Sequence, residues 1–83
     1  MNPDNRWPLK VGEPNWAPLE SAITREECED YMYMGRAGKI ELYKHRWTRQ
    51  YLNIASDGQT FYRYAGGEYV EVERAVALDH VRN

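Results

Sequence analysis

Hydrophobic and polar positions alternate between Lys39 and Glu73, and this period of two predicts a β-sheet. The dipeptides Asp57-Gly58 and Gly66-Gly67 divide the later part of the stretch. Such dipeptides are typical of two-residue hairpin turns, because Gly and, to a lesser degree, Asp tolerate positive φ. We therefore expect a four-stranded antiparallel meander, with strands that begin at Ile40 and then cover 49–55, 59–65 and 68–72.

Two-residue turns would also fix the pairing register of this sheet. Ile54 then opposes Phe61, which opposes Val72, and Tyr51 opposes Tyr64, which opposes Tyr69. Because strand side chains alternate between faces, one face is predicted to be buried and to collect Leu52, Ile54, Phe61, Val70 and Val72. The other face collects Tyr51, Tyr62, Tyr64 and Tyr69. A three-residue loop at Ser56-Asp57-Gly58 would instead shift the register by one and move Tyr62 to the side of Leu52.

The first strand is expected to bury Ile40 and Leu42, the aliphatic residues that alternate with Glu41 and Tyr43. Placing them on the face of Leu52 and Ile54 requires an odd-length connection centred near Trp47. Residues 45–49 are then a hairpin tip.

Two helices are predicted around the sheet. Thr24-Arg25-Glu26-Glu27 fits a capping box, with Cys28, Tyr31 and Met32 at helical spacing and Gly35 as a stop, so we expect a helix over 24–34. Residues 73–81 place Ala77, Leu78 and Val81 on one side and predict a short closing helix. Both helices are expected to cover the aliphatic sheet face, which gives an α+β fold.

The N-terminal segment is predicted to be extended. Prolines at positions 3, 8, 14 and 18 disfavour helix at themselves and at the preceding residues. We expect an arm over 1–18 and a single domain over 19–83. Trp7 and Trp16 are expected to pack this arm against the domain, with capture of a partner as the alternative.

Composition narrows the class of protein. The 83 residues carry a net charge of −2, and the single Cys28 excludes an intrachain disulfide. No apolar run is long enough to cross a membrane and no targeting signal is evident, so we expect a small, soluble, cytoplasmic protein with no membrane partner. Residues 36–64 hold six Lys and Arg against two acidic residues, so the sheet is the basic part of an acidic chain.

The sequence contains few features that indicate catalysis, and we predict that the protein is not an enzyme. No metalloprotease, nucleophile-elbow or phosphate-loop motif occurs, and His45 and His80 fall in different predicted elements. Cys28 is expected to be an inert hydrophobic residue of the first helix. No metal or cofactor is predicted.

Two binding functions from different classes compete. An exposed cluster of Tyr51, Tyr62, Tyr64 and Tyr69 is typical of a protein interface, which favours an unknown protein partner or self-association. The alternative is single-stranded nucleic acid bound by the hairpin tip over 43–51, where charge and aromatic rings interleave at Lys44, His45, Arg46, Trp47 and Arg49. The first hypothesis fails if the N-terminal arm covers the tyrosines.

Overall fold

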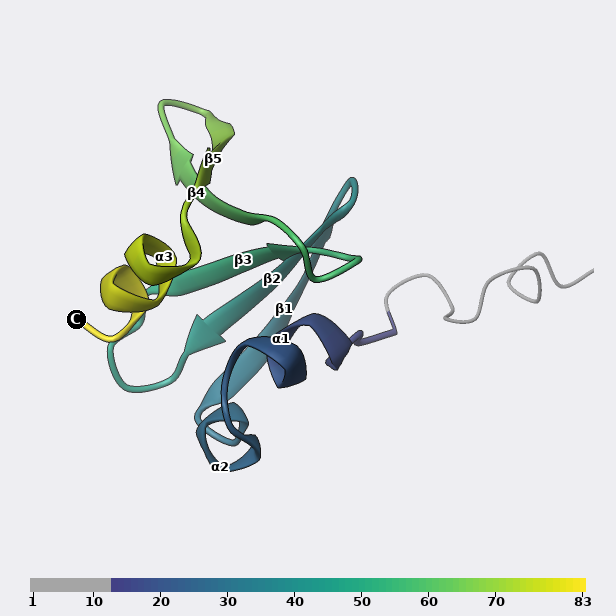
Figure 1. The fold of residues 1–83 in the computed structure, drawn as a ribbon, viewed down its shortest axis with the longest axis vertical. Helices are drawn as coiled ribbons and strands as arrows, with labels where there is room; N and C mark the ends of the chain where they lie inside the picture. The colour runs from purple at the N-terminus through teal and green to yellow at the C-terminus, as the bar shows by residue number, and fades with distance from the viewer. Residues whose placement is uncertain (1–12) are drawn as a thin grey trace, which may run out of the picture.

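The computed structural model describes residues 13–83 and has an α+β architecture with an antiparallel sheet (Figure 1). The described helices are α1 (Ala17–Ala22), α2 (Arg25–Cys28) and α3 (Arg74–Val81). The described strands are β1 (Tyr31–Ala37), β2 (Ile40–His45), β3 (Tyr51–Ala55), β4 (Phe61–Ala65) and β5 (Glu68–Val72). These five strands lie in the order β1-β2-β3-β4-β5, so each strand pairs with its neighbours in the chain.

The sheet has one strand more than predicted, because β1 replaces the second half of the predicted helix over 24–34. The helix start is correct: the Thr24 hydroxyl accepts from the Glu27 N–H at 3.1 Å, and the Glu27 carboxylate accepts from the Thr24 N–H. The helix nevertheless ends at Cys28. From Tyr31 onward the chain alternates, with Tyr31 buried and Met32 exposed.

The predicted orientation of the first meander strand is wrong. Tyr43 opposes Leu52 and Glu41 opposes Ile54, so Glu41 and Tyr43 share the buried face. Ile40 and Leu42 lie on the opposite face and are half-buried. The connection between β2 and β3 therefore differs by one residue from the odd-length connection that burial of Ile40 and Leu42 required.

The two later hairpins follow the predicted register. Ile54 pairs with Phe61, Phe61 with Val72, and Tyr64 with Tyr69, as predicted. Gly66 and Gly67 form a two-residue turn, but the predicted two-residue turn at Asp57-Gly58 is wrong: the Ala55 N–H donates to the Thr60 carbonyl, and the Gly58 N–H donates to the Ala55 carbonyl. The β3–β4 ladder includes only the pairs at Asn53 and Ile54, however, and the β4–β5 hairpin then projects away from the other strands (Figure 1). For this reason Val70, predicted to be buried, is 47% exposed.

The core lies between the sheet and the helices α1 and α3. Leu52, Ile54 and Phe61 from the sheet form one cluster with buried residues of both helices: Leu19, Ala22, Ala77, Leu78 and Val81. The guanidinium of Arg74 in α3 donates to the carbonyl of Ala22, which joins the two helices. No helix of residues 13–83 has the length and apolar character to cross a membrane.

The N-terminal segment packs on this covered face as far as it is described. The Trp16 ring centroid lies 5.8 Å from that of Tyr43 and 6.0 Å from that of Tyr33. The Tyr43 hydroxyl donates to the carbonyl of Asn15 at 2.5 Å. Trp7 and most of the predicted arm lie outside the described residues.

Candidate binding groove

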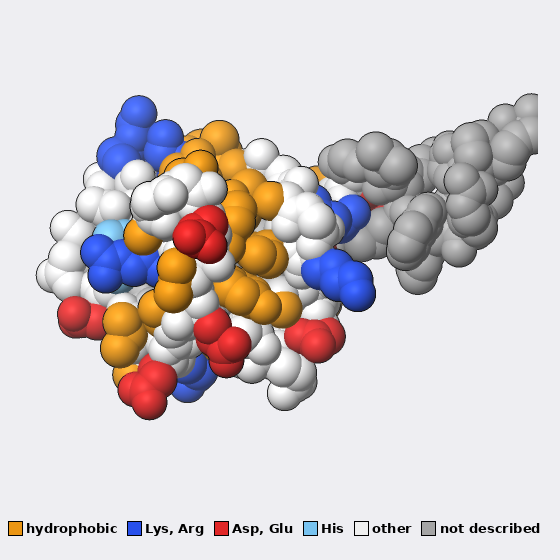
Figure 2. All heavy atoms as spheres, turned by 90° about the horizontal axis from the view of Figure 1, so that it is seen from above, with side chains coloured by type: hydrophobic (Ala, Val, Ile, Leu, Met, Phe, Trp, Pro, Cys, Tyr) orange, Lys and Arg blue, Asp and Glu red, His pale blue; other side chains and the backbone are white. Residues whose placement is uncertain are grey.

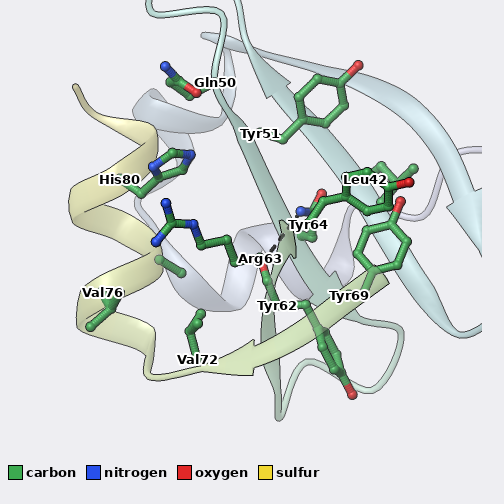
Figure 3. A pocket seen from close by; sticks show the side chains of 12 residues that line it. Leu42, Gln50, Tyr51, Tyr62, Arg63, Tyr64, Tyr69, Val72, Val76 and His80 are labelled. Carbon is green, nitrogen blue, oxygen red and sulfur yellow. Dashed lines mark hydrogen bonds between the residues drawn. The ribbon is translucent and has the colours of Figure 1, made fainter. Parts of the chain in front are cut away.

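A groove of about 400 Å³ opens where β3 and β4 separate. We call it the tyrosine groove. Helix α3 forms a further wall of this groove (Figure 3). Its lining consists of Leu42, Gln50, Tyr51, Asn53, Tyr62, Arg63, Tyr64, Tyr69, Val72, Val76, Ala77 and His80.

The groove results from the short β3–β4 ladder. Pairing stops at Asn53 and Tyr62, so the predicted neighbours Tyr51 and Tyr64 belong to the same register but lie beyond the paired region. β4 continues with β5 as a separate hairpin, whereas β3 stays with β2. The two strands therefore form opposite walls instead of a closed sheet surface.

The structure brings the four predicted tyrosines together in this lining. Tyr51 is 38% exposed on the β3 side, and Tyr64 is 59% exposed on the β4 side. Tyr64 and Tyr69 form an edge-to-face pair with ring centroids 4.8 Å apart. Trp16 packs on the opposite face of the sheet, against Tyr43, and so does not cover these rings.

Asn53 contributes a polar group that sequence reasoning missed. The residue is 3% exposed and lines the groove. Its Nδ2 donates to the Tyr62 carbonyl at a long 3.5 Å, while Oδ1 has no hydrogen-bond partner within residues 13–83. Asn interrupts an otherwise apolar run, Tyr51-Leu52-Asn53-Ile54, and that interruption was the available signal.

Apart from the tyrosines, the side chains with acidic or basic groups in the described lining are those of Arg63 and His80. Arg63 is exposed and His80 is half-buried, and the lining as described contains no Asp or Glu. Figure 3 shows the Arg63 side chain directed toward α3, which carries His80. Glu71 and Asp79 are exposed and lie outside the lining.

Hydrophobic surface continues beyond the groove. Seen from the end where the β4–β5 hairpin projects, hydrophobic side chains form a band between scattered charges (Figure 2). Tyr64, Val70 and Val76 are the large hydrophobic residues that the hairpin and α3 expose. Exposed hydrophobic area of this kind often marks an interaction surface.

The residues of the predicted nucleic-acid site differ in their exposure in the structure. Arg46, Trp47 and Arg49 are exposed, with Trp47 at 71%. Lys44 and His45 belong to β2 and are half-buried, and the Lys44 Nζ lies 5.9 Å from the Tyr51 ring centroid. Tyr43, which the prediction placed in the tip, is buried.

The tip is also tied to the rest of the chain. The Trp47 indole donates to the Asp30 carboxylate at 3.1 Å, and the Thr48 hydroxyl donates to the Val81 carbonyl at 2.6 Å. The His45 Nδ1 accepts from the backbone N–H groups of Trp47 and Thr48, each at 3.2 Å. Part of the predicted binding set therefore holds the loop in shape.

Glu41 is the centre of a second polar cluster, on the covered face. Its buried carboxylate accepts from the Tyr33 hydroxyl at 2.5 Å, the Arg36 Nε at 2.7 Å, the Ser56 hydroxyl at 2.5 Å and the Asn15 amide at 3.4 Å. These donors come from β1, from the β3–β4 turn and from the segment before α1. Because the Glu41 carboxylate accepts all these hydrogen bonds, it connects three parts of the fold. We therefore interpret the cluster as structural.

The described residues contain no group of three or more His, Cys, Asp or Glu side chains that could hold a metal ion. Burial raises the pKa of the half-buried Cys28 thiol, which disfavours the reactive thiolate.

Comparisons of the chain with protein-family models, with curated proteins and with solved structures find no significant match.

Proposed function

We propose that this protein is a non-enzymatic interaction module that binds a segment of a partner protein in the tyrosine groove. The observation that carries the proposal is a groove of about 400 Å³ lined by Tyr51, Tyr62, Tyr64 and Tyr69. Ligand sites typically occupy about 300–1,000 Å³ and combine apolar walls with a few polar groups. A second copy of this chain is the alternative partner.

Tyrosine suits such a site. Its ring offers a large contact area while few torsions are immobilised, and its hydroxyl can still form a hydrogen bond. Tyr51 and Tyr64 stand on different strands at the two sides of the groove, so a bound chain would contact both. Truncation of a central aromatic anchor commonly costs about 2 kcal/mol or more of binding free energy.

The proposal includes the non-enzymatic character and the cytoplasmic location expected from the sequence. The half-buried Cys28, whose thiol pKa is raised, supports the first point because it is a poor nucleophile. The single cysteine supports the second, because disulfides are rare in cytosolic proteins.

A peptide-display experiment tests the proposal. A random peptide library is panned against the immobilised protein, and enriched peptides are titrated by fluorescence anisotropy. We expect the Tyr51→Ala, Tyr64→Ala double variant to weaken binding by about tenfold or more. Both side chains are more than one third exposed, so the variant should keep its fold.

The matched control is the Arg46→Ala, Trp47→Ala double variant, which removes two exposed residues of the hairpin tip. It should retain the affinity of the wild type. Peptides that bind both double variants as tightly as they bind the wild type would exclude the groove as their site.

Nucleic-acid binding at the hairpin tip is the second candidate, and the 71% exposure of Trp47 between Arg46 and Arg49 favours it. Lys and Arg contacts to phosphates release counterions, so such binding should weaken by about a decade or more between low and physiological salt. A salt series with a single-stranded oligonucleotide measures this. Tight, salt-steep binding that the Arg46→Ala, Trp47→Ala variant loses would favour the tip over the groove.

A further inference from the structure

We infer that the occupant of the tyrosine groove is an extended, acidic segment of the partner, bound as an added strand along the free edge of β4. This inference rests on the proposed function and specifies its ligand. Three independent features of the groove support it: a free strand edge, a buried acceptor without a partner, and a basic lining.

The free strand edge is the part of β4 beyond the β3–β4 ladder. Arg63, Tyr64 and Ala65 pair with β5, but the ladder to β3 ends at Tyr62. Within residues 13–83, no strand occupies that side of the three residues. Unpaired backbone groups at a strand edge are a template for another extended chain, and strand addition is a common mode of peptide recognition.

Asn53 supplies the buried acceptor at the point where the ladder ends. A buried polar atom without a hydrogen bond destabilises the protein, so proteins rarely keep one without a reason. Because Nδ2 is directed to the Tyr62 carbonyl, Oδ1 is the atom left to accept from a ligand. A backbone N–H of an inserted chain is a donor of the required kind.

The basic lining selects the charge of the segment. Arg63 and His80 are the charged or titratable groups in the lining besides the tyrosines, and the lining as described has no carboxylate to neutralise Arg63. An Arg guanidinium can bind a carboxylate through two parallel hydrogen bonds. The whole chain carries a net charge of −2, so this preference for acidic ligands is local to the groove.

Three labelled peptide pools test the inference. Each peptide has about six residues, a typical strand length, and alternates mixed apolar residues with glutamate. The second pool has lysine in place of glutamate. The third is the glutamate pool with backbone N-methylation at alternate residues, which removes donors needed for strand pairing.

We expect the glutamate pool to bind about tenfold or more tightly than either other pool, as measured by fluorescence anisotropy. Arg63→Glu should reverse the order of the glutamate and lysine pools. Arg46→Glu makes the same charge change at the exposed tip and serves as the matched control, which should leave the order unchanged. Equal affinity for the N-methylated pool would overturn strand addition, and preference for lysine would overturn the acidic ligand.

Asn53→Leu separates a binding role from a structural one. Leucine has a similar size and removes the unsatisfied acceptor, so the thermal midpoint of the free protein should stay equal or rise. Affinity for the glutamate pool should fall by about tenfold. A lower midpoint with unchanged affinity would assign Asn53 to the fold alone.

The failure of this inference differs from the failure of the proposed function. If panned peptides are neutral or basic but still lose affinity in the Tyr51→Ala, Tyr64→Ala variant, the groove binds proteins and the acidic strand is wrong. If no peptide depends on those tyrosines, both proposals fail. Dimerisation of the free protein that the same variant abolishes would assign the groove to a second copy and overturn the inference.

Discussion

The Tyr33 hydroxyl donates to the Oε1 of Glu41 at 2.5 Å, across the β1–β2 hairpin. The same carboxylate accepts from Arg36 and Ser56, so one buried side chain holds both β1 and the β3–β4 turn. Removing the Glu41 carboxylate would take this acceptor from the Arg36 guanidinium and the Tyr33 hydroxyl and would leave the Ser56 hydroxyl with the Lys39 carbonyl alone. Such losses are among the larger effects of single substitutions.

We predict that Glu41→Ala lowers the free energy of unfolding by about 3–5 kcal/mol. Glu41→Gln keeps the size and an acceptor oxygen, so it should cost less, about 1–3 kcal/mol. Urea unfolding followed by circular dichroism measures both values. Equal stability of the wild type and Glu41→Ala would show that the cluster does not form in solution.

Acid should weaken the fold through the same residue. Burial alone would raise the pKa of Glu41, but hydrogen bonds from Arg36, Ser56 and Tyr33 outweigh it and hold the pKa below its usual value of 4.5. A carboxyl group with a lower pKa in the folded state adds stability above pH 4.5, and this stability is lost as the pH falls through the folded pKa. The free energy of unfolding, measured over a pH series, should therefore fall more steeply toward acid pH for the wild type than for Glu41→Gln.

Alkali should weaken the fold through the half-buried Tyr33. Burial and the hydrogen bond to Glu41 raise the pKa of Tyr33 from 10 to about 12. A raised folded pKa means that this stability is present below pH 10 and is lost as the pH rises through about 12. Tyrosinate absorbance and unfolding recorded together should show the loss, and Tyr33→Phe should reduce it. Identical alkaline profiles for the two proteins would contradict the assignment.

The later hairpins could be predicted because their information is local. Gly66-Gly67 forms the two-residue turn that sets the pairing of Phe61 with Val72. Asp57-Gly58 marks the position of the β3–β4 turn, and Ile54 pairs with Phe61 although the connection from Ala55 to Thr60 is longer than two residues. The capping box at Thr24 is equally local and is present in the structure. A cap defines where a helix begins, however, and says little about its length.

Strand β1 was missed because its alternation is between two kinds of hydrophobic residue. Tyr31 and Tyr33 point toward the core side while Met32 and Met34 are exposed, so a hydrophobic–polar pattern does not reveal the period of two. The buried face of β2 was predicted wrongly for a related reason. A charged residue was assigned to solvent, and only the tertiary structure supplies the donors from Arg36 and Ser56 that allow Glu41 to be buried.

The candidate site was predictable in part. Alternation placed Tyr51, Tyr62, Tyr64 and Tyr69 on one face, and the structure puts all four in the groove lining. The groove itself depends on the point where β3 and β4 separate and on the position of α3, which no local pattern encodes. His80 therefore could not be assigned to the groove from the sequence, and the polar residue at Asn53 was a signal only of an unusual position in the strand.

The position of the β4–β5 hairpin gives a matched test with two valines that sequence analysis placed together in the core. Val70 is 47% exposed, whereas Val72 packs against the buried cluster. Val→Thr keeps the shape and adds a hydroxyl, which is costly only where water is excluded. We expect Val70→Thr to change the free energy of unfolding by no more than about 0.5 kcal/mol, and Val72→Thr to cost about 1–2 kcal/mol. Chemical unfolding of the two variants side by side measures the difference. An equal loss for both would mean that the hairpin folds back onto the helices, which would bury Val70 and close the groove between β3 and β4.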